Sequence, residues 1–347
     1  MTRGSFVVFT VSPVKTRQDT QPYATMISSY AYLVSSALVR LIRPCNLGAA
    51  KASVLAGGAR KIREMVQDLI LPSRRDRDPE LFVKIFGSGA RTLVFVAGLG
   101  GTTRYWETRV TELAQEHRIV LVDLLGFGRS PKPWVKYSAE RHVDALQRVL
   151  APLGPVTLVG HSLGALIAAA YAARHTETVE RLVLISLPHF GSQDAAYTYM
   201  RQGPVKGGLI YTNVLLTMLA CIITRRLLGR ILPYLIRDIP REVVEDLVKH
   251  TWRSSTSSLW DVVYRHDVAD DLRILEPVHH VLCIHGSDDI MAPLAPVRGL
   301  AEAYSNVQLC VLEGLDHHPF LREPERCCEL IASFAEQAAR EAMLPNG

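Results

Sequence analysis

The chain has 347 residues, of which 48% are hydrophobic and 21% charged, so it can bury a large core and has a globular rather than a disordered composition. Its formal charge of +5 is concentrated at the amino end. Residues 1–78 carry 12 Lys and Arg against 5 Asp and Glu, and the rest of the chain carries a net charge of −2. The basic charge is therefore a property of the N-terminal part and gives no indication of the substrate of the rest of the chain, and no motif in the sequence supports nucleic-acid binding. Six cysteines without metal-ligand spacing indicate neither a disulfide framework nor a zinc site, which favours a reducing, cytoplasmic compartment.

Residues 1–78 are predicted to form a basic, helical N-terminal extension that ends in a charged linker. Apolar residues recur at helical spacing over 26–43 and again over 51–71. These two segments either pack on the rest of the protein or are partly disordered, lie on an anionic membrane surface as a peripheral contact, or bind a partner. Met1 and Met26 are both candidate start residues.

From residue 79 onward, strands are predicted to alternate with helices. The strands are expected at 81–86, 92–97, 118–122, 156–160, 181–186, 278–285 and 307–312. Helices are expected at 139–150, 295–304 and 324–343, directly after residue 164, and around Trp106, Val110 and Leu113. This alternation predicts an α/β fold, with a mostly parallel sheet flanked on both faces by helices.

A helix-rich insertion at 190–265 interrupts the alternation and divides the core into two parts, 79–189 and 266–347. It contains a run of eighteen residues without a charge, at 207–224. A transmembrane span is one interpretation of this run, but Tyr211, Thr212 and Asn213 interrupt its apolar character. We therefore expect a helical cap over the carboxyl edge of the sheet, with an apolar face that lines a pocket.

A serine between glycines follows the strand at 156–160. Residues 160–164 read Gly-His-Ser-Leu-Gly, and an alanine-rich helix begins directly after them. A serine on such a strand-to-helix turn has a strained backbone and an accessible hydroxyl. That hydroxyl becomes a nucleophile when a base removes its proton and a third group holds the base.

Acidic and histidine residues directly follow two later strands. Asp289 lies in the loop after the strand that ends at His285, and His317 lies in the loop after 307–312. Because the carboxyl ends of parallel strands share one edge, Ser162, Asp289 and His317 are expected to meet there. Their order in the chain is the order typical of a nucleophile elbow. The neighbouring Asp288 and His318 offer the same chemical groups.

Five motifs in this order resemble the α/β-hydrolase superfamily, in its capped, lipase- and esterase-like branch, over 81–334. The motifs are HG-x-G at 97–100, D-x-x-G-x-G-x-S at 123–130, G-H-S-x-G at 160–164, G-x-x-D-x-x-x-P at 286–293 and H-x-P-x-x-x-x-P at 317–324. The resemblance selects Asp289 over Asp288, and His317 over His318. One position departs from the pattern, since Ala97 stands where the family usually has a histidine that supports the loop.

The resemblance implies a cofactor-independent serine hydrolase. Ser162 would attack a carbonyl, with His317 as general base and Asp289 holding the imidazole ring. The backbone N–H groups of Leu163 and Leu99 would stabilise the oxyanion. The apolar insertion favours a small-molecule ester with an apolar acyl or alcohol part, without a metal or a nucleic acid. Two rival functions are a carbon–carbon bond hydrolase acting on a dienoic diketo acid and a non-catalytic ligand-binding or scaffold protein on the same fold.

Overall fold

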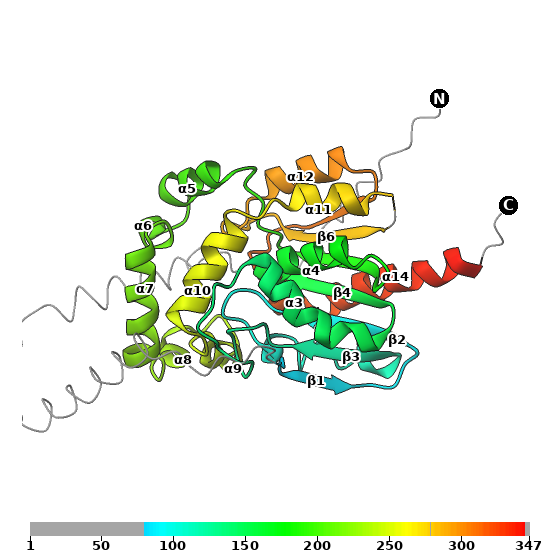
Figure 1. The fold of residues 1–347 in the computed structure, drawn as a ribbon, viewed down its shortest axis with the longest axis horizontal. Helices are drawn as coiled ribbons and strands as arrows, with labels where there is room; N and C mark the ends of the chain where they lie inside the picture. The colour runs from blue at the N-terminus through cyan, green and yellow to red at the C-terminus, as the bar shows by residue number, and fades with distance from the viewer. Residues whose placement is uncertain (1–79, 278, 344–347) are drawn as a thin grey trace, which may run out of the picture.

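The computed structural model describes residues 80–277 and 279–343. Its centre is a seven-stranded sheet with the order β1-β3-β2-β4-β5-β6-β7 (Figure 1). The strands are β1 (Val83–Phe86), β2 (Arg91–Val96), β3 (His117–Val122), β4 (Val156–His161), β5 (Val179–Ile185), β6 (Val281–Gly286) and β7 (Val307–Leu312). The predicted N-terminal extension, with its segments 26–43 and 51–71, lies outside the described residues.

Strand pairing places the carboxyl ends of six strands at one edge of the sheet. All neighbouring strands pair in parallel except β1, which pairs antiparallel with β3. Although β1 and β2 are consecutive in the chain, β3 lies between them in the sheet. The loops that follow β2, β4, β6 and β7 therefore converge on the same edge.

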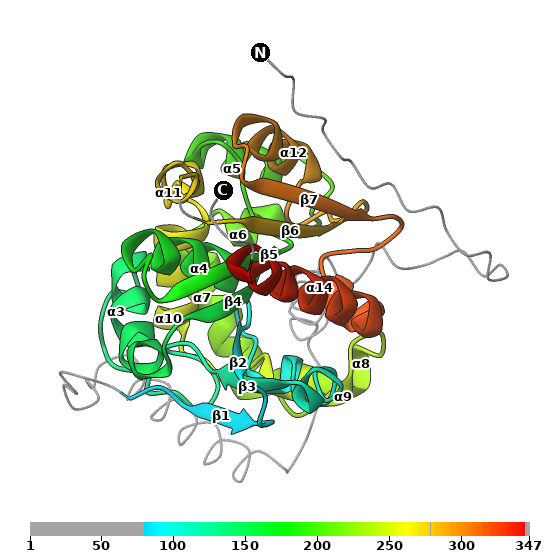
Figure 2. The same cartoon turned by 90° about the vertical axis from the view of Figure 1, so that its right-hand side faces the viewer.

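The side chains of the central strands alternate between two apolar cores, one on each face. In β2, Val94 and Val96 lie in one core, while Leu93 and Phe95 lie in the other. The first core is covered by four of the described helices, α3 (Ala139–Leu150), α4 (Leu163–Arg174), α11 (Val268–Leu275) and α12 (Leu294–Ala303) (Figure 2). The second core is covered by segment 103–115, α13 (Pro319–Arg322) and α14 (Pro324–Met343). Burial on both faces explains the near-continuous apolar strands. The predicted α/β architecture is confirmed.

The prediction of a helix around Trp106 is wrong. The segment forms only short 3₁₀ turns at Thr103–Tyr105 and Leu113–Gln115, and Trp106 between them is buried. Threonine and aromatic residues have modest helix propensity. The first turn is also held from outside, because Asp123 Oδ1 accepts a hydrogen bond from the Thr103 N–H at 2.6 Å.

Between β5 and β6 the chain forms a helical insertion, which lies beyond the carboxyl ends of the parallel strands (Figure 1). Its helices are α5 (Gln193–Gln202), α6 (Gly208–Tyr211), α7 (Val214–Ile223), α8 (Leu232–Leu235), α9 (Arg241–Asp246) and α10 (Trp252–Ser258), with π-helical turns at Thr224–Leu228 and Leu259–Val263. The uncharged run is divided into α6 and α7 because Asn213 caps α7, accepting a hydrogen bond from the Leu216 N–H at 3.1 Å. Within 80–277 and 279–343, no helix has both the length and the apolar character to cross a bilayer.

Candidate active site

Ser162 lies at a sharp turn between β4 and α4. Its backbone has φ +52° and ψ −119°, and this positive φ is strained for a residue with a side chain. The turn is tight enough that a Cβ on Gly160 would lie 2.3 Å from the Gly164 carbonyl oxygen, and only glycine fits there. The Ser162 N–H donates to the Ile185 carbonyl at 2.9 Å, which ties the turn to β5. The serine is thereby fixed at the carboxyl edge of the sheet.

The structure brings the three predicted side chains together in one hydrogen-bonded chain. His317 Nε2 lies 2.9 Å from Ser162 Oγ, and His317 Nδ1 lies 2.8 Å from Asp289 Oδ2. Since a carboxylate only accepts, the proton of the neutral ring belongs on Nδ1. Nε2 is then left to accept the hydroxyl proton of Ser162, which is the arrangement that general-base catalysis requires.

Asp289 is held in its ionised form in spite of its burial. Its side chain is fully enclosed, and its Oδ1 accepts hydrogen bonds from the N–H groups of Met291 and Ala292 at 2.9 and 2.8 Å. Burial by itself raises the pKa of this carboxyl, but the interaction with the hydrogen-bonded His317 ring, together with those of His285 and the Ala292 N–H, outweighs that effect and lowers the pKa. Asp289 is therefore a fixed negative charge behind the His317 ring.

Two neighbouring residues with the same chemical groups, Asp288 and His318, are not part of this hydrogen-bonded chain. Asp288 bonds Ser287 within its own loop at 3.0 Å. His318 lines the cavity described below, with Nδ1 3.4 Å from the Tyr105 hydroxyl. His161 is buried, and its Nε2 donates to the His317 carbonyl at 2.8 Å. Sequence reasoning missed Tyr105, whose ring stacks on His161 with 4.8 Å between centroids.

The two backbone groups predicted for an oxyanion hole lie beside Ser162. Leu163 is the first residue of α4, so its N–H has no acceptor within the helix. Leu99 lies in the glycine-rich loop after β2, which is so close that a Cβ on Gly98 would lie 3.0 Å from Ser162 Cβ. Their role in binding an oxyanion stays a prediction.

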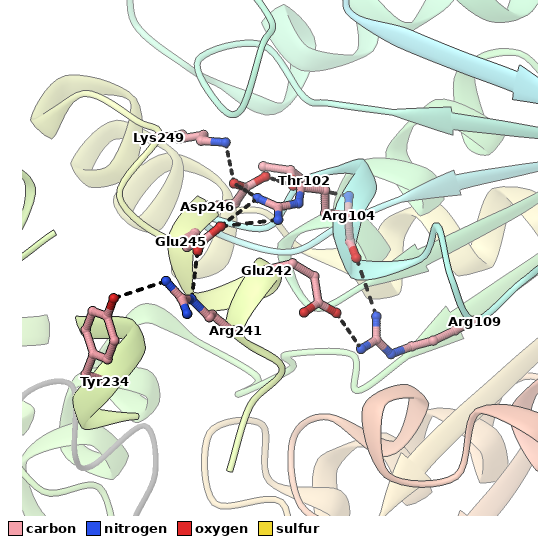
Figure 3. Close-up of polar contacts among 9 residues, drawn as sticks. All are labelled: Thr102, Arg104, Arg109, Tyr234, Arg241, Glu242, Glu245, Asp246 and Lys249. Atoms are coloured by element: carbon pink, nitrogen blue, oxygen red, sulfur yellow. Dashed lines mark hydrogen bonds and ion pairs between the residues drawn. The ribbon is translucent and has the colours of Figure 1, made fainter. Parts of the chain in front are cut away.

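The loop after β2 is anchored to the helical insertion rather than by a histidine at position 97. Thr102 Oγ1 donates to Asp246 Oδ2 at 2.7 Å, and Arg104 pairs with Asp246 at 3.0 Å and with Glu245 at 3.3 Å (Figure 3). Asp246 is buried and lies at the end of α9. The sequence carries no signal for this contact, because its partners are 144 positions apart.

Replacing Asp246 with alanine is expected to lower the free energy of unfolding by about 1–3 kcal/mol, since the Thr102 hydroxyl loses its buried acceptor. We also expect kcat to fall about tenfold with little change in KM, because the loop beside Ser162 loses its anchor. Urea unfolding and ester kinetics test both effects. Glu245→Ala is the matched control, because that partly exposed ion pair contributes about 1 kcal/mol or less, and equal effects of both variants would contradict the anchor.

A cavity of about 210 Å³ opens onto Ser162 and His317. Core residues such as Leu99 and Tyr105 form its floor, and residues of the insertion, among them Ala220, Ile236 and Leu259, form its walls. No lysine or arginine is among the described residues that line it. In the described residues there is also no group of three or more His, Cys, Asp or Glu side chains arranged to hold a metal ion.

Several buried histidines in and near this region are kept neutral. Burial lowers the pKa of His142 and of His161 to about 3 and that of His250 to about 4, and for His161 the nearby His317 adds to the effect. The unfolded chain therefore binds more protons than the native protein below the ordinary histidine pKa of about 6.5. These groups do not affect stability above that pH and destabilise the fold as the pH falls from there toward 4.

At about pH 5 each of these histidines is expected to cost about 2 kcal/mol of unfolding free energy relative to neutral pH. Urea unfolding at about pH 7.5 and about pH 5 measures the fall. In His142→Gln the fall should be smaller by about 2 kcal/mol, whatever that substitution does to stability at neutral pH. The same pH dependence in both proteins would show that His142 is not a neutral group in the native state.

Comparison with known proteins identifies the family. The model of the family described as "Alpha/beta hydrolase family" matches residues 93–330. The 2-hydroxymuconate semialdehyde hydrolase of Pseudomonas putida is 31% identical over 241 residues, which cover 65% of this chain and 79% of that protein. A probable lysophospholipase of Arabidopsis thaliana, BODYGUARD 4, is 26% identical over 250 residues, covering 66% of this chain and 60% of that protein.

Solved structures share the fold. The crystal structure of a bromoperoxidase from Bacillus anthracis has a TM-score of 0.62 at 21% identity, covering 74% of this chain and 96% of that one. The match of the family model spans the glycine-rich loop, the serine turn and both loops that carry Asp289 and His317. The chain belongs to the alpha/beta hydrolase family and is a hydrolase of that fold.

Proposed function

We propose that this hydrolase cleaves carboxylic esters that carry an apolar acyl or alcohol part, with Ser162 as the nucleophile. The observation that carries the proposal is the hydrogen-bonded chain from Asp289 through His317 to Ser162, which ends at an apolar cavity. Hydrogen-bonding distances between the three side chains support their proposed roles as nucleophile, base and orienting acid.

The geometry supports a two-step mechanism. His317 Nε2 takes the Ser162 proton as Oγ attacks the ester carbonyl, and the N–H groups of Leu163 and Leu99 stabilise the oxyanion. The imidazolium then protonates the departing alcohol, which leaves an acyl group on Ser162. Water activated by His317 attacks this acyl group, and the acid leaves as Oγ regains its proton. Asp289 stabilises the imidazolium in both steps.

Hydrolysis of a carbon–carbon bond is the second candidate, favoured by the similarity to the semialdehyde hydrolase of Pseudomonas putida. A dienoic diketo acid carries a carboxylate, which in an enclosed site needs a cationic partner. The described lining has no lysine or arginine, and burial keeps its His250 and His161 neutral. A neutral ester therefore fits this cavity better than an anionic diketo acid.

A series of p-nitrophenyl esters of graded acyl length tests the proposal. We expect kcat/KM to rise about threefold to fourfold for each added methylene until the cavity is filled, because burying one methylene contributes about 0.8 kcal/mol. Ala220 lies on the cavity wall, so Ala220→Phe should move the optimum to shorter chains. Ala303→Phe, at an exposed position of α12, is the matched control. Preference for the acetyl ester, or cleavage of a dienoic diketo acid at the rate of the best ester, would contradict the proposal.

A further inference from the structure

Exposed apolar side chains gather on one part of the helical insertion. Of the eleven large hydrophobic residues that are exposed among the described residues, nine lie between positions 209 and 235. They are Leu209, Val214, Leu215, Leu216, Leu219, Leu227, Ile231, Tyr234 and Leu235. Figure 1 shows α6, α7 and α8, which carry most of them, along the edge of the molecule farthest from the sheet. Clustering of this kind marks an interaction surface, whereas single exposed apolar residues do not.

Helix α7 is apolar on two sides. On the outer side, Leu215 is 68% exposed and Leu219 is 49% exposed. On the inner side, Thr217, Ala220 and Cys221 are buried and line the cavity above Ser162. The same helix therefore separates the exposed apolar surface from the cavity that holds the nucleophile.

The charges within the segment that carries this surface have one sign. Between Asp194 and Asp238 there is no acidic residue, and the segment carries Arg201, Lys206, Arg225, Arg226, Arg230 and Arg237. Arg230 and Arg237 are exposed and lie on either side of α8. Exposed leucines combined with arginines are typical of segments that insert into the headgroup region of an anionic bilayer.

We propose that residues 209–237, the apolar-basic face, dock this hydrolase on an anionic phospholipid membrane, with α7 against the lipid. A second copy of the chain is a poor occupant, because a two-fold contact would place arginines opposite arginines. The chain's own residues 1–78 are a poor occupant for the same reason, since their net charge is +7. Phosphate headgroups complement the arginines, and acyl chains cover the leucines.

The docked position also narrows the class of substrate. This consequence rests on the proposed esterase function. With α7 on the lipid, an ester from the membrane has a short path into the cavity that the inner side of α7 lines. The substrate class is then a membrane-soluble ester, presented from the bilayer rather than from water. The membrane contact itself does not depend on catalysis.

Vesicle co-sedimentation of the full chain tests the membrane contact. Vesicles of phosphatidylglycerol and phosphatidylcholine should bind the wild type, and pure phosphatidylcholine vesicles should bind it more weakly. The double variant Leu215→Glu/Leu219→Glu should lower the partition coefficient at least about tenfold. The matched control is Ile85→Glu/Ile274→Glu, which makes the same change at residues that are 50% and 54% exposed on β1 and α11. It should bind as the wild type does.

The contribution of the arginines to vesicle binding is tested separately. Arg230→Gln and Arg237→Gln should each lower the partition coefficient on anionic vesicles about fivefold, whereas Arg298→Gln, at an exposed position of α12, should leave it unchanged. Equal binding by the wild type and the double leucine variant would overturn the proposal. A wild-type dimer that the leucine variant converts to a monomer, with no binding to vesicles, would assign the face to a second copy and also overturn it.

Measurements of turnover distinguish a failure of this inference from a failure of the proposed esterase activity. The ratio of activity on a long-chain ester embedded in anionic vesicles to activity on a short soluble ester should fall about tenfold in the double leucine variant and stay constant in its control. Loss of vesicle binding without a change in this ratio would overturn delivery of the substrate from the membrane. Absence of activity on every ester would overturn the esterase proposal, while the vesicle binding measured above would still decide the membrane contact.

Discussion

Replacing Ser162 with alanine is expected to lower kcat/KM for ester hydrolysis by about 10⁴- to 10⁶-fold and to abolish labelling by a fluorophosphonate. The reason is that the hydroxyl 2.9 Å from His317 Nε2 is the only part of the arrangement that forms the covalent bond in the proposed mechanism. His317→Ala should cost about as much. The double variant should be no slower than either single variant, because nucleophile and base act as one unit.

The control for this experiment is Ser305→Ala, which removes an exposed hydroxyl that bonds Glu276. It should keep both labelling and turnover. Labelling that survives in Ser162→Ala would show that another residue is the nucleophile. Additive losses in the double variant would show that His317 acts independently of Ser162.

Replacing Gly164 with alanine is expected to destabilise the fold by at least about 3 kcal/mol. A Cβ at this position would lie 2.4 Å from the Val96 carbonyl oxygen and 2.6 Å from that of Ala97. Both atoms belong to backbone that cannot rotate away, so α4 would have to move off the sheet. Because α4 begins at the serine turn, the same displacement should also lower turnover. Chemical unfolding and ester kinetics measure the two effects.

Gly299→Ala is the matched control, since it makes the same substitution within a helix. A Cβ on Gly299 of α12 would meet no atom within 4 Å. Alanine should therefore be neutral or stabilise the protein by up to about 1 kcal/mol, because it has the higher helix propensity. A Gly164→Ala protein as stable as the wild type would mean that the packing of α4 on β2 is not tight.

The sheet and the candidate triad could be predicted from sequence because each relevant residue directly follows a buried strand. Ser162, Asp289 and His317 come after β4, β6 and β7, and parallel pairing alone brings those strand ends to one edge. The strand at 307–312 and the helices at 139–150 and 324–343 match the structure at both ends. Apolar runs and helical periodicity are strong local signals there.

Features that depend on contacts far apart in the chain could not be predicted. The bond between Thr102 and Asp246 has no local signal, and neither does the position of β3 between β1 and β2. The segment around Trp106 has helical spacing of apolar residues, but Asp123 and weak propensity hold it in 3₁₀ turns. The uncharged run at 207–224 predicts one apolar face, directed toward a pocket. Hydrophobicity alone could not reveal that α7 would also present a second apolar face to solvent.

The helical insertion leaves the sheet after β5 and returns at β6, and these two strands are direct hydrogen-bonded neighbours. The backbone hydrogen bonds between β5 and β6 therefore form without any contribution from the insertion. An evolving family can therefore exchange or lengthen that segment as a module, and so change the walls of the cavity, while Ser162, His317 and Asp289 stay together on loops of the core. The contacts that Thr102 and Arg104 make with Asp246 and Glu245 are the constraints we identify that a grafted module has to reproduce.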